Sequence, residues 1–132
     1  MNKNIFKSDR YFTVFDFTVS HGQLLLRASK DDRDNQNIDL IFFGVRYMQL
    51  FTSLFGLSVK LVEKDQKPIN YNSVNSFVSA DNNSLFEIET GNEKFYIGAS
   101  YFIVYENELE FDESSLGLLD VHKRGKELQR SN

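Results

Sequence analysis

The stretch NIDLIFFGVRYMQLF, residues 37–51, decides the fold, because it is the one long segment that is apolar on both sides of an extended strand. Side chains alternate between the two faces of a strand, and between residues 40 and 45 neither face offers a polar group. The apolar spacing also fits a helix. However, the β-branched and aromatic content favours a strand, and so does the cost of about 1 kcal/mol for Gly44 inside a helix. We therefore predict a central strand covered on both faces.

Arg46 marks the point at which we expect this strand to leave the core, so that it is buried up to Val45. A guanidinium within an apolar stretch needs a carboxylate partner or a path to water. Asp16 and Asp39 are the candidate partners.

Shorter runs before and after this stretch indicate further strands. They cover residues 11–20, 23–29, 57–63, 74–80, 85–90 and 94–105, with 109–111 as a short edge strand. The run 94–105 is either one strand bent at Gly98, which we favour, or two strands. His21-Gly22 and Gly91-Asn92 are predicted hairpin turns.

Helical signals are few. Residues 51–56 could form a short helical turn that ends at Gly56. Towards the end of the chain, a helix from Ser115 and a last strand over residues 118–121 are alternatives. The pattern predicts an all-β fold: a single antiparallel domain of about seven or eight strands, in a sandwich or a partly open barrel, with at most one or two short helical segments.

Size and composition predict one domain. The chain has 132 residues, of which 41% are hydrophobic, enough for one core. We place the domain at residues 1–119, with residues 1–10 frayed, and expect a mobile, polar and basic tail at 120–132. The absence of cysteine excludes disulfides, zinc–thiolate sites and a cysteine nucleophile. No apolar run indicates a secretion signal or a membrane helix, so we expect a soluble cytoplasmic protein.

Charge is distributed unevenly along the chain. Residues 84–113 carry eight acidic residues and one basic residue, a local net charge of −7, whereas the last ten residues carry a net charge of +3. Phosphate recognition needs a continuous basic face, so a nucleic-acid partner is not expected. A basic protein fits this composition better, because clustered acids steer association with such a partner.

The acids of this region are the candidate partner-binding residues. Those from residue 106 onward would share one face of an extended chain, about 7 Å apart. That spacing overlaps the spacing of glycosidase carboxylates, but such pairs flank a cleft. We therefore predict a small non-enzymatic interaction protein, of inhibitor or immunity type, that binds a basic macromolecule. Its candidate residues are Glu87, Glu89, Glu106, Glu108, Glu110 and Asp112.

The alternative is a ligand-binding β module for a small molecule or a glycan. Its cleft would be lined by Tyr101 and Tyr105. We predict no cofactor and no catalytic residue, because His21 and His122 share no metal-ligand spacing and no G-x-S-x-G motif is present. The oligomeric state is also open. In a homodimer, a second copy of the chain would cover Phe51, Leu54 and Phe55.

Residues 30–39 are rich in the oxygen donors that calcium prefers. The EF-hand pattern starting at Asp32 fails, because position six is Asn37 in place of glycine and position twelve is Phe43 in place of glutamate. A cation site of another kind stays open, and a solvated connection between strands is the favoured interpretation.

Overall fold

The computed structural model describes residues 3–63, 72–79, 83–117 and 121–132. These residues form nine strands in one sheet. The strands are β1 (Lys3–Thr18), β2 (Gln23–Ala28), β3 (Asn37–Phe43), β4 (Tyr47–Gln49), β5 (Ser53–Val62), β6 (Ser84–Thr90), β7 (Glu93–Ala99), β8 (Tyr101–Asn107) and β9 (Lys126–Arg130). The helical elements are α1 (Asn72–Ser79) and the 3₁₀ helix η1 (Val121–Arg124). The predicted all-β antiparallel class is confirmed, with nine strands in place of seven or eight.

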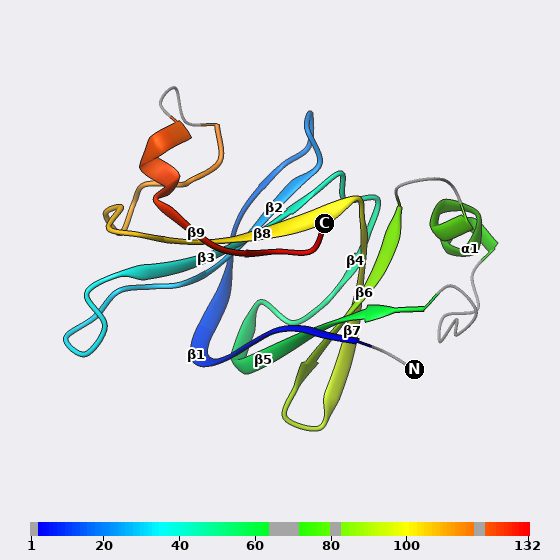
Figure 1. Ribbon diagram of the computed structural model, residues 1–132, viewed down its shortest axis with the longest axis horizontal. Helices are drawn as coiled ribbons and strands as arrows, with labels where there is room; N and C mark the ends of the chain where they lie inside the picture. The colour runs from blue at the N-terminus through cyan, green and yellow to red at the C-terminus, as the bar shows by residue number, and fades with distance from the viewer. Residues whose placement is uncertain (1–2, 64–71, 80–82, 118–120) are drawn as a thin grey trace.

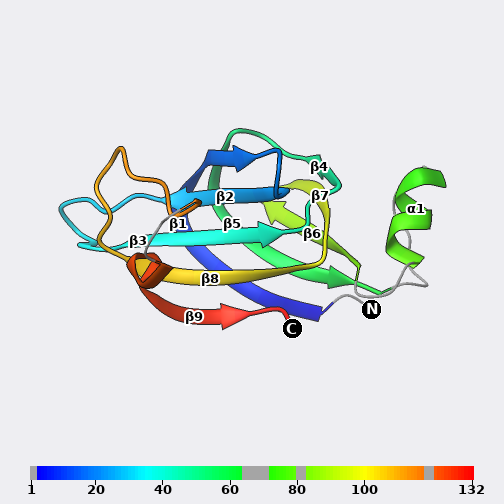
Figure 2. The same cartoon turned by 90° about the horizontal axis from the view of Figure 1, so that it is seen from above.

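The strand order is β4-β7-β6-β5-β1-β2-β3-β8-β9, and every neighbouring pair is antiparallel. The 16-residue strand β1 joins the two halves of the sheet, because most of its length pairs with β5 and its C-terminal part pairs with β2. Irregular register at three places in β1 bends it. The sheet therefore curves around one interior and stays open between its edges (Figures 1 and 2).

The core lies between the two halves of the curved sheet. Phe42 from β3, Phe86 from β6 and Phe102 from β8 meet there, with ring centroids 5.3 to 5.6 Å apart. Because β6 is four strands away from β3 in the sheet, only the curvature brings these rings together. Both predicted hairpins are confirmed as hairpins. The turn between β6 and β7 is Gly91-Asn92, as predicted, whereas the turn between β1 and β2 covers residues 19–22 in place of His21-Gly22 alone.

The central strand is confirmed in its position and corrected in its length. β3 lies between β2 and β8, and both of its faces are buried. It ends at Phe43, and the chain then crosses to the far edge of the sheet, where β4 pairs with β7. Gly44 makes this crossing with φ of +68°, and a Cβ atom there would lie 2.5 Å from Oγ of Ser100. A left-handed conformation in a crowded place favours glycine.

Two segments differ from their predicted structure because tertiary packing outweighs local pattern. The predicted helical turn over 51–56 is wrong, since Ser53 begins β5 and pairs with Thr13 of β1. The predicted strand over 74–80 is also wrong: α1 turns Val74 and Val78 towards Val62 of β5 and Leu85 of β6. Residue 80 lies outside the described residues.

The run 94–105 consists of two strands, the alternative that we did not favour. A bend at Ser100 separates β7 from β8, which pair with different neighbours. The predicted fraying of residues 3–10 is wrong, since they belong to β1.

The segment after β8 is irregular up to residue 117, so the predicted edge strand over 109–111 is wrong. The alternatives predicted here, a helix from Ser115 and a strand over residues 118–121, both include residues 118–120, which lie outside the described residues. Residues 115–117 form a bend, and Val121 begins η1. Beyond them, residues 126–130 of the predicted tail form β9, which pairs with β8. None of the helices in the described ranges is long and apolar enough to cross a membrane.

Candidate functional site

The six predicted partner-binding acids do not share one face. Glu87 and Glu89 lie on β6, which is separated from β8 by β5, β1, β2 and β3. Glu106 is half-buried near the end of β8, paired in register with Ile38 and Lys126. The other three follow β8 in the irregular segment. The alternation assumed for residues 106–112 ends where the strand ends, at Asn107.

The pair on β6 is engaged within the protein. Nζ of Lys60 donates a hydrogen bond of 2.8 Å to Glu89 and lies 3.9 Å from Oε2 of Glu87. Glu87 is 3% exposed and accepts a 3.4 Å hydrogen bond from the Tyr96 hydroxyl. Burial and the charge of Glu87 raise the pKa of Tyr96. The carboxylate of Glu87 is therefore too enclosed to contact a partner.

The pair formed by Lys60 and Glu89 gives a prediction for pH. The hydrogen bond from Lys60 lowers the pKa of Glu89 below its ordinary value of 4.5. A lowered folded-state pKa stabilises the fold above the unfolded pKa, and this contribution is lost as pH falls through the folded-state value. Lys60→Met should therefore raise the pKa of Glu89 in a carboxyl NMR titration. Protonation of Glu89 at low pH should then cause a smaller loss of stability in this variant than in the wild-type protein.

Lys94→Met is the matched control, since Lys94 contributes less than Lys60 to the pKa of Glu89. We expect it to leave that pKa almost unchanged. Equal shifts in the two variants would contradict the assignment to the Lys60 hydrogen bond.

Two acidic loops lie side by side at one end of the sheet, residues 29–36 between β2 and β3 and residues 108–113 after β8 (Figures 1 and 2). Lys30 joins them, because its Nζ donates 2.8 Å to the carbonyl of Glu108 and lies 3.3 Å from Oε2 of Glu110. We call the exposed acids of the two loops the acidic end. They are Asp31, Asp32, Asp34, Glu108, Glu110 and Asp112.

Each loop is held in a defined shape. The Asp31 carboxylate accepts hydrogen bonds from the backbone N–H groups of Arg33 and Asp34, at 2.8 and 2.9 Å, and these bonds lower its pKa. Such side-chain to backbone bonds are typical of tight turns. Within the described ranges, no group of three or more acidic or histidine side chains could hold a metal ion. Asp31 instead fixes the turn of the first loop.

A buried polar network holds the second loop. Arg27 and Asp39, 1% and 0% exposed, form a two-point ion pair of 2.7 and 2.9 Å. Nη1 of Arg27 donates 2.6 Å to the carbonyl of Glu113, and Nδ2 of Asn37 donates 2.9 Å to that of Leu109. Side chains of β2 and β3 therefore fix the backbone of residues 108–113.

Asp39 is thus the partner of Arg27 and not of Arg46, which is exposed at the end of the crossing after β3. Asp16, the other candidate, accepts a 2.6 Å hydrogen bond from Ser114. Arg46 reaches water, the second outcome expected for it.

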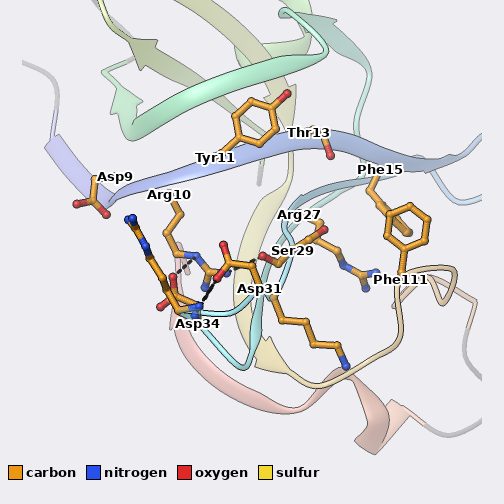
Figure 3. Close-up of a pocket in the computed structure, with 12 residues that line it drawn as sticks. Asp9, Arg10, Tyr11, Thr13, Phe15, Arg27, Ser29, Asp31, Asp34 and Phe111 are labelled. Carbon is orange, nitrogen blue, oxygen red and sulfur yellow. Dashed lines mark hydrogen bonds and ion pairs between the residues drawn. The ribbon is translucent and has the colours of Figure 1, made fainter.

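A hollow of about 810 Å³ opens beside the acidic end (Figure 3). Figure 3 shows Asp9, Arg10, Asp31 and Asp34 at one side of it and Phe15 and Phe111 at the other. Two of the guanidiniums that line it, those of Arg10 and Arg27, are bonded within the protein, and Lys30 is held by the second loop. The exposed Arg33 also lines it. Arg10 donates to the carbonyls of Gln36 and Ser29, at 3.0 and 2.9 Å, and the donors of Arg27 are used in the buried network.

The two tyrosines of the alternative prediction lie on the outer face of β8. Tyr101 stacks on Phe43, with ring centroids 4.8 Å apart, and lines a second hollow of about 410 Å³ with Ser100 and Ser131. Tyr105 packs against the buried cluster that contains Leu25 and Ile41. Tyr105 is therefore part of the packing of the sheet.

The predictions from sequence missed the exposed aromatic side chains near the acidic end, Tyr11 and Phe111. The available signal was a phenylalanine between Glu110 and Asp112, in a strongly acidic stretch. Comparison with protein-family models, curated proteins and solved structures finds no match for the chain. The candidate site therefore depends on its geometry alone.

Proposed function

We propose that this protein is a small non-enzymatic interaction protein that binds a basic protein through the acidic end. The observation that carries the proposal is the pairing of the two acidic loops, which Lys30 ties together. In this proposal the protein acts in the cytoplasm as an inhibitor or immunity-type protein. The acidic end includes three of the six acids predicted from sequence, Glu108, Glu110 and Asp112. Glu87, Glu89 and Glu106 are not part of it.

Charge and rigidity support this proposal. Six exposed carboxylates lie in the two loops, together with the basic residues Lys30 and Arg33, and Lys30 is already engaged by the second loop. A concentration of one charge steers a partner of the opposite charge during encounter. Loops that are already fixed by hydrogen bonds also lose less conformational entropy on binding.

The test uses two variants with the same change in net charge. Asp32→Asn with Glu108→Gln neutralises two exposed acids of the acidic end, and Glu63→Gln with Glu93→Gln neutralises two exposed acids elsewhere. Quantitative co-purification with the wild-type chain and both variants should identify a basic protein that only the first variant loses. With the purified partner, we expect about a tenfold weaker affinity for the first variant. Added salt should reduce the difference.

Equal loss of partner in both variants would contradict the proposal, because net charge and not the acidic end would then determine binding. The same partners in all three samples would contradict it too.

The small-molecule alternative has one supporting observation, the hollow with its aromatic side chains. Against it, the hollow is open to solvent beside Phe111, which is 83% exposed. Small-molecule sites usually enclose most of the ligand surface. A surface that mixes exposed aromatic and charged side chains fits a macromolecular interface better.

A further inference from the structure

Phe111 lies between Glu110 and Asp112 in the second acidic loop and is 83% exposed. Tyr11 of β1, 48% exposed, lines the same hollow, and the half-buried Phe15 lies at the side of the hollow near Phe111 (Figure 3). Aromatic side chains dominate binding energy in protein interfaces because they bury a large area at a small entropic cost. An exposed phenylalanine that lies between two acidic residues in the chain is therefore a candidate anchor.

The turn that carries Phe111 is closed by its own hydrogen bonds. The backbone N–H of Glu113 donates 2.9 Å to the carbonyl of Glu110, and the N–H of Glu110 donates 2.8 Å to the Glu113 carboxylate. Arg27 holds the carbonyl of Glu113 from below, while its guanidinium lies 4.2 Å from the centre of the Phe15 ring. The exposed ring is thus presented by a backbone that is fixed from the buried side.

The lining side chains that are not already bonded within the protein determine which ligand groups the hollow can hold. The guanidiniums of Arg10 and Arg27 have their hydrogen-bond donors occupied by protein carbonyls and carboxylates. Lys30 also lines the hollow but is held by the second loop. A ligand therefore meets aromatic faces, the carboxylates of Asp9, Asp31 and Asp34, and the exposed side chain of Arg33. Aromatic faces attract apolar groups and cations, and carboxylates attract cations.

We infer that the turn of residues 110–113 is the anchor of the partner interface, and that the partner inserts an aromatic side chain, flanked by lysine or arginine, into the hollow beside Phe111. This inference depends on the proposed function, since the same acidic end would hold the flanking cations. It adds to that function the class of peptide segment that is recognised.

The test is an NMR titration of the full ¹⁵N-labelled chain with two synthetic peptides, Lys-Arg-Phe-Arg-Lys and Lys-Arg-Gly-Arg-Lys. The phenylalanine peptide should shift the amide signals of Tyr11, Phe15, Phe111 and the loop at 31–34. The glycine peptide should bind about five- to tenfold more weakly, as expected for the loss of one buried aromatic group.

Variants then assign the contact. Phe111→Ala should weaken binding of the phenylalanine peptide about five- to tenfold. Phe51→Ala removes another exposed ring, 56% exposed, which packs on Phe95 outside the hollow. It should change binding by less than about twofold. Because both rings are exposed, both variants are expected to fold.

The outcomes separate the inference from the proposed function. Equal binding of the two peptides, weakened only by Asp32→Asn with Glu108→Gln, would overturn the inference and support the electrostatic site. Shifts that map away from the hollow, or an unchanged affinity in Phe111→Ala, would also overturn it. Binding of neither peptide would overturn it as well, and the co-purification experiment would still decide the proposed function.

Discussion

Replacing Asp39 with alanine is expected to lower the free energy of unfolding by about 3–5 kcal/mol, because it leaves Arg27 as a buried cation without its counter-ion. Both side chains are almost fully buried, at 0% and 1% exposed, and are joined by two hydrogen bonds. Asp39 also accepts a 2.9 Å hydrogen bond from Asn107. Urea unfolding followed by circular dichroism would measure the loss.

Two further variants test whether the loss of stability in Asp39→Ala comes from the unpaired buried charge. Asp34→Ala removes a carboxylate that lies 3.5 Å from Arg10 but is 51% exposed, and an exposed pair contributes at most about 1 kcal/mol. Arg27→Leu combined with Asp39→Leu removes both charges, and should be more stable than Asp39→Ala by about 1 kcal/mol or more. A loss below about 1 kcal/mol for Asp39→Ala would show that the buried pair does not hold the fold.

Phe42→Ala should lower the free energy of unfolding by about 3–5 kcal/mol, through lost burial and the cavity left behind. Its ring is fully buried and contacts Phe86 and Phe102, from the two opposed halves of the sheet. We therefore expect this one substitution to weaken the packing of both halves of the sheet. Thermal and urea unfolding measure it.

The same substitution at an exposed ring is the control. Phe55→Ala, on the outer face of β5, should change the free energy of unfolding by no more than about 0.5 kcal/mol. Equal losses for Phe42→Ala and Phe55→Ala would contradict a core centred on the three phenylalanines.

The local sequence pattern was sufficient to predict part of the fold. The alternation of β6, with Phe86 and Ile88 inward, and the presence of hairpins around residues 21–22 and 91–92 follow from side-chain period and turn chemistry. These features depend on residues close in sequence. For the same reason, the position of α1 and the identity of β5 were missed, since α1 depends on packing against Val62 and Leu85 and β5 on pairing with β1.

The candidate site shows the same division. The sequence identified Glu108, Glu110 and Asp112 as exposed acids, and residues 31–34 as a polar loop, because both depend on composition alone. Counting charge along the chain also grouped Glu87 with them, although the sheet order separates β6 from β8 by four strands. Linear charge density carries no information about which strands become neighbours.

The sequence by itself determined that the stretch starting at residue 37 contains a buried strand of an antiparallel β fold, since an apolar run on both faces has to be covered wherever it lies. Only the tertiary structure decided that the chain turns at Gly44, that Asp39 pairs with Arg27, and that Lys30 joins two acidic loops. The two side-chain contacts join residues 12 and 78 positions apart. Such contacts form only when the sheet curves and sets its strand order, which no local pattern specifies.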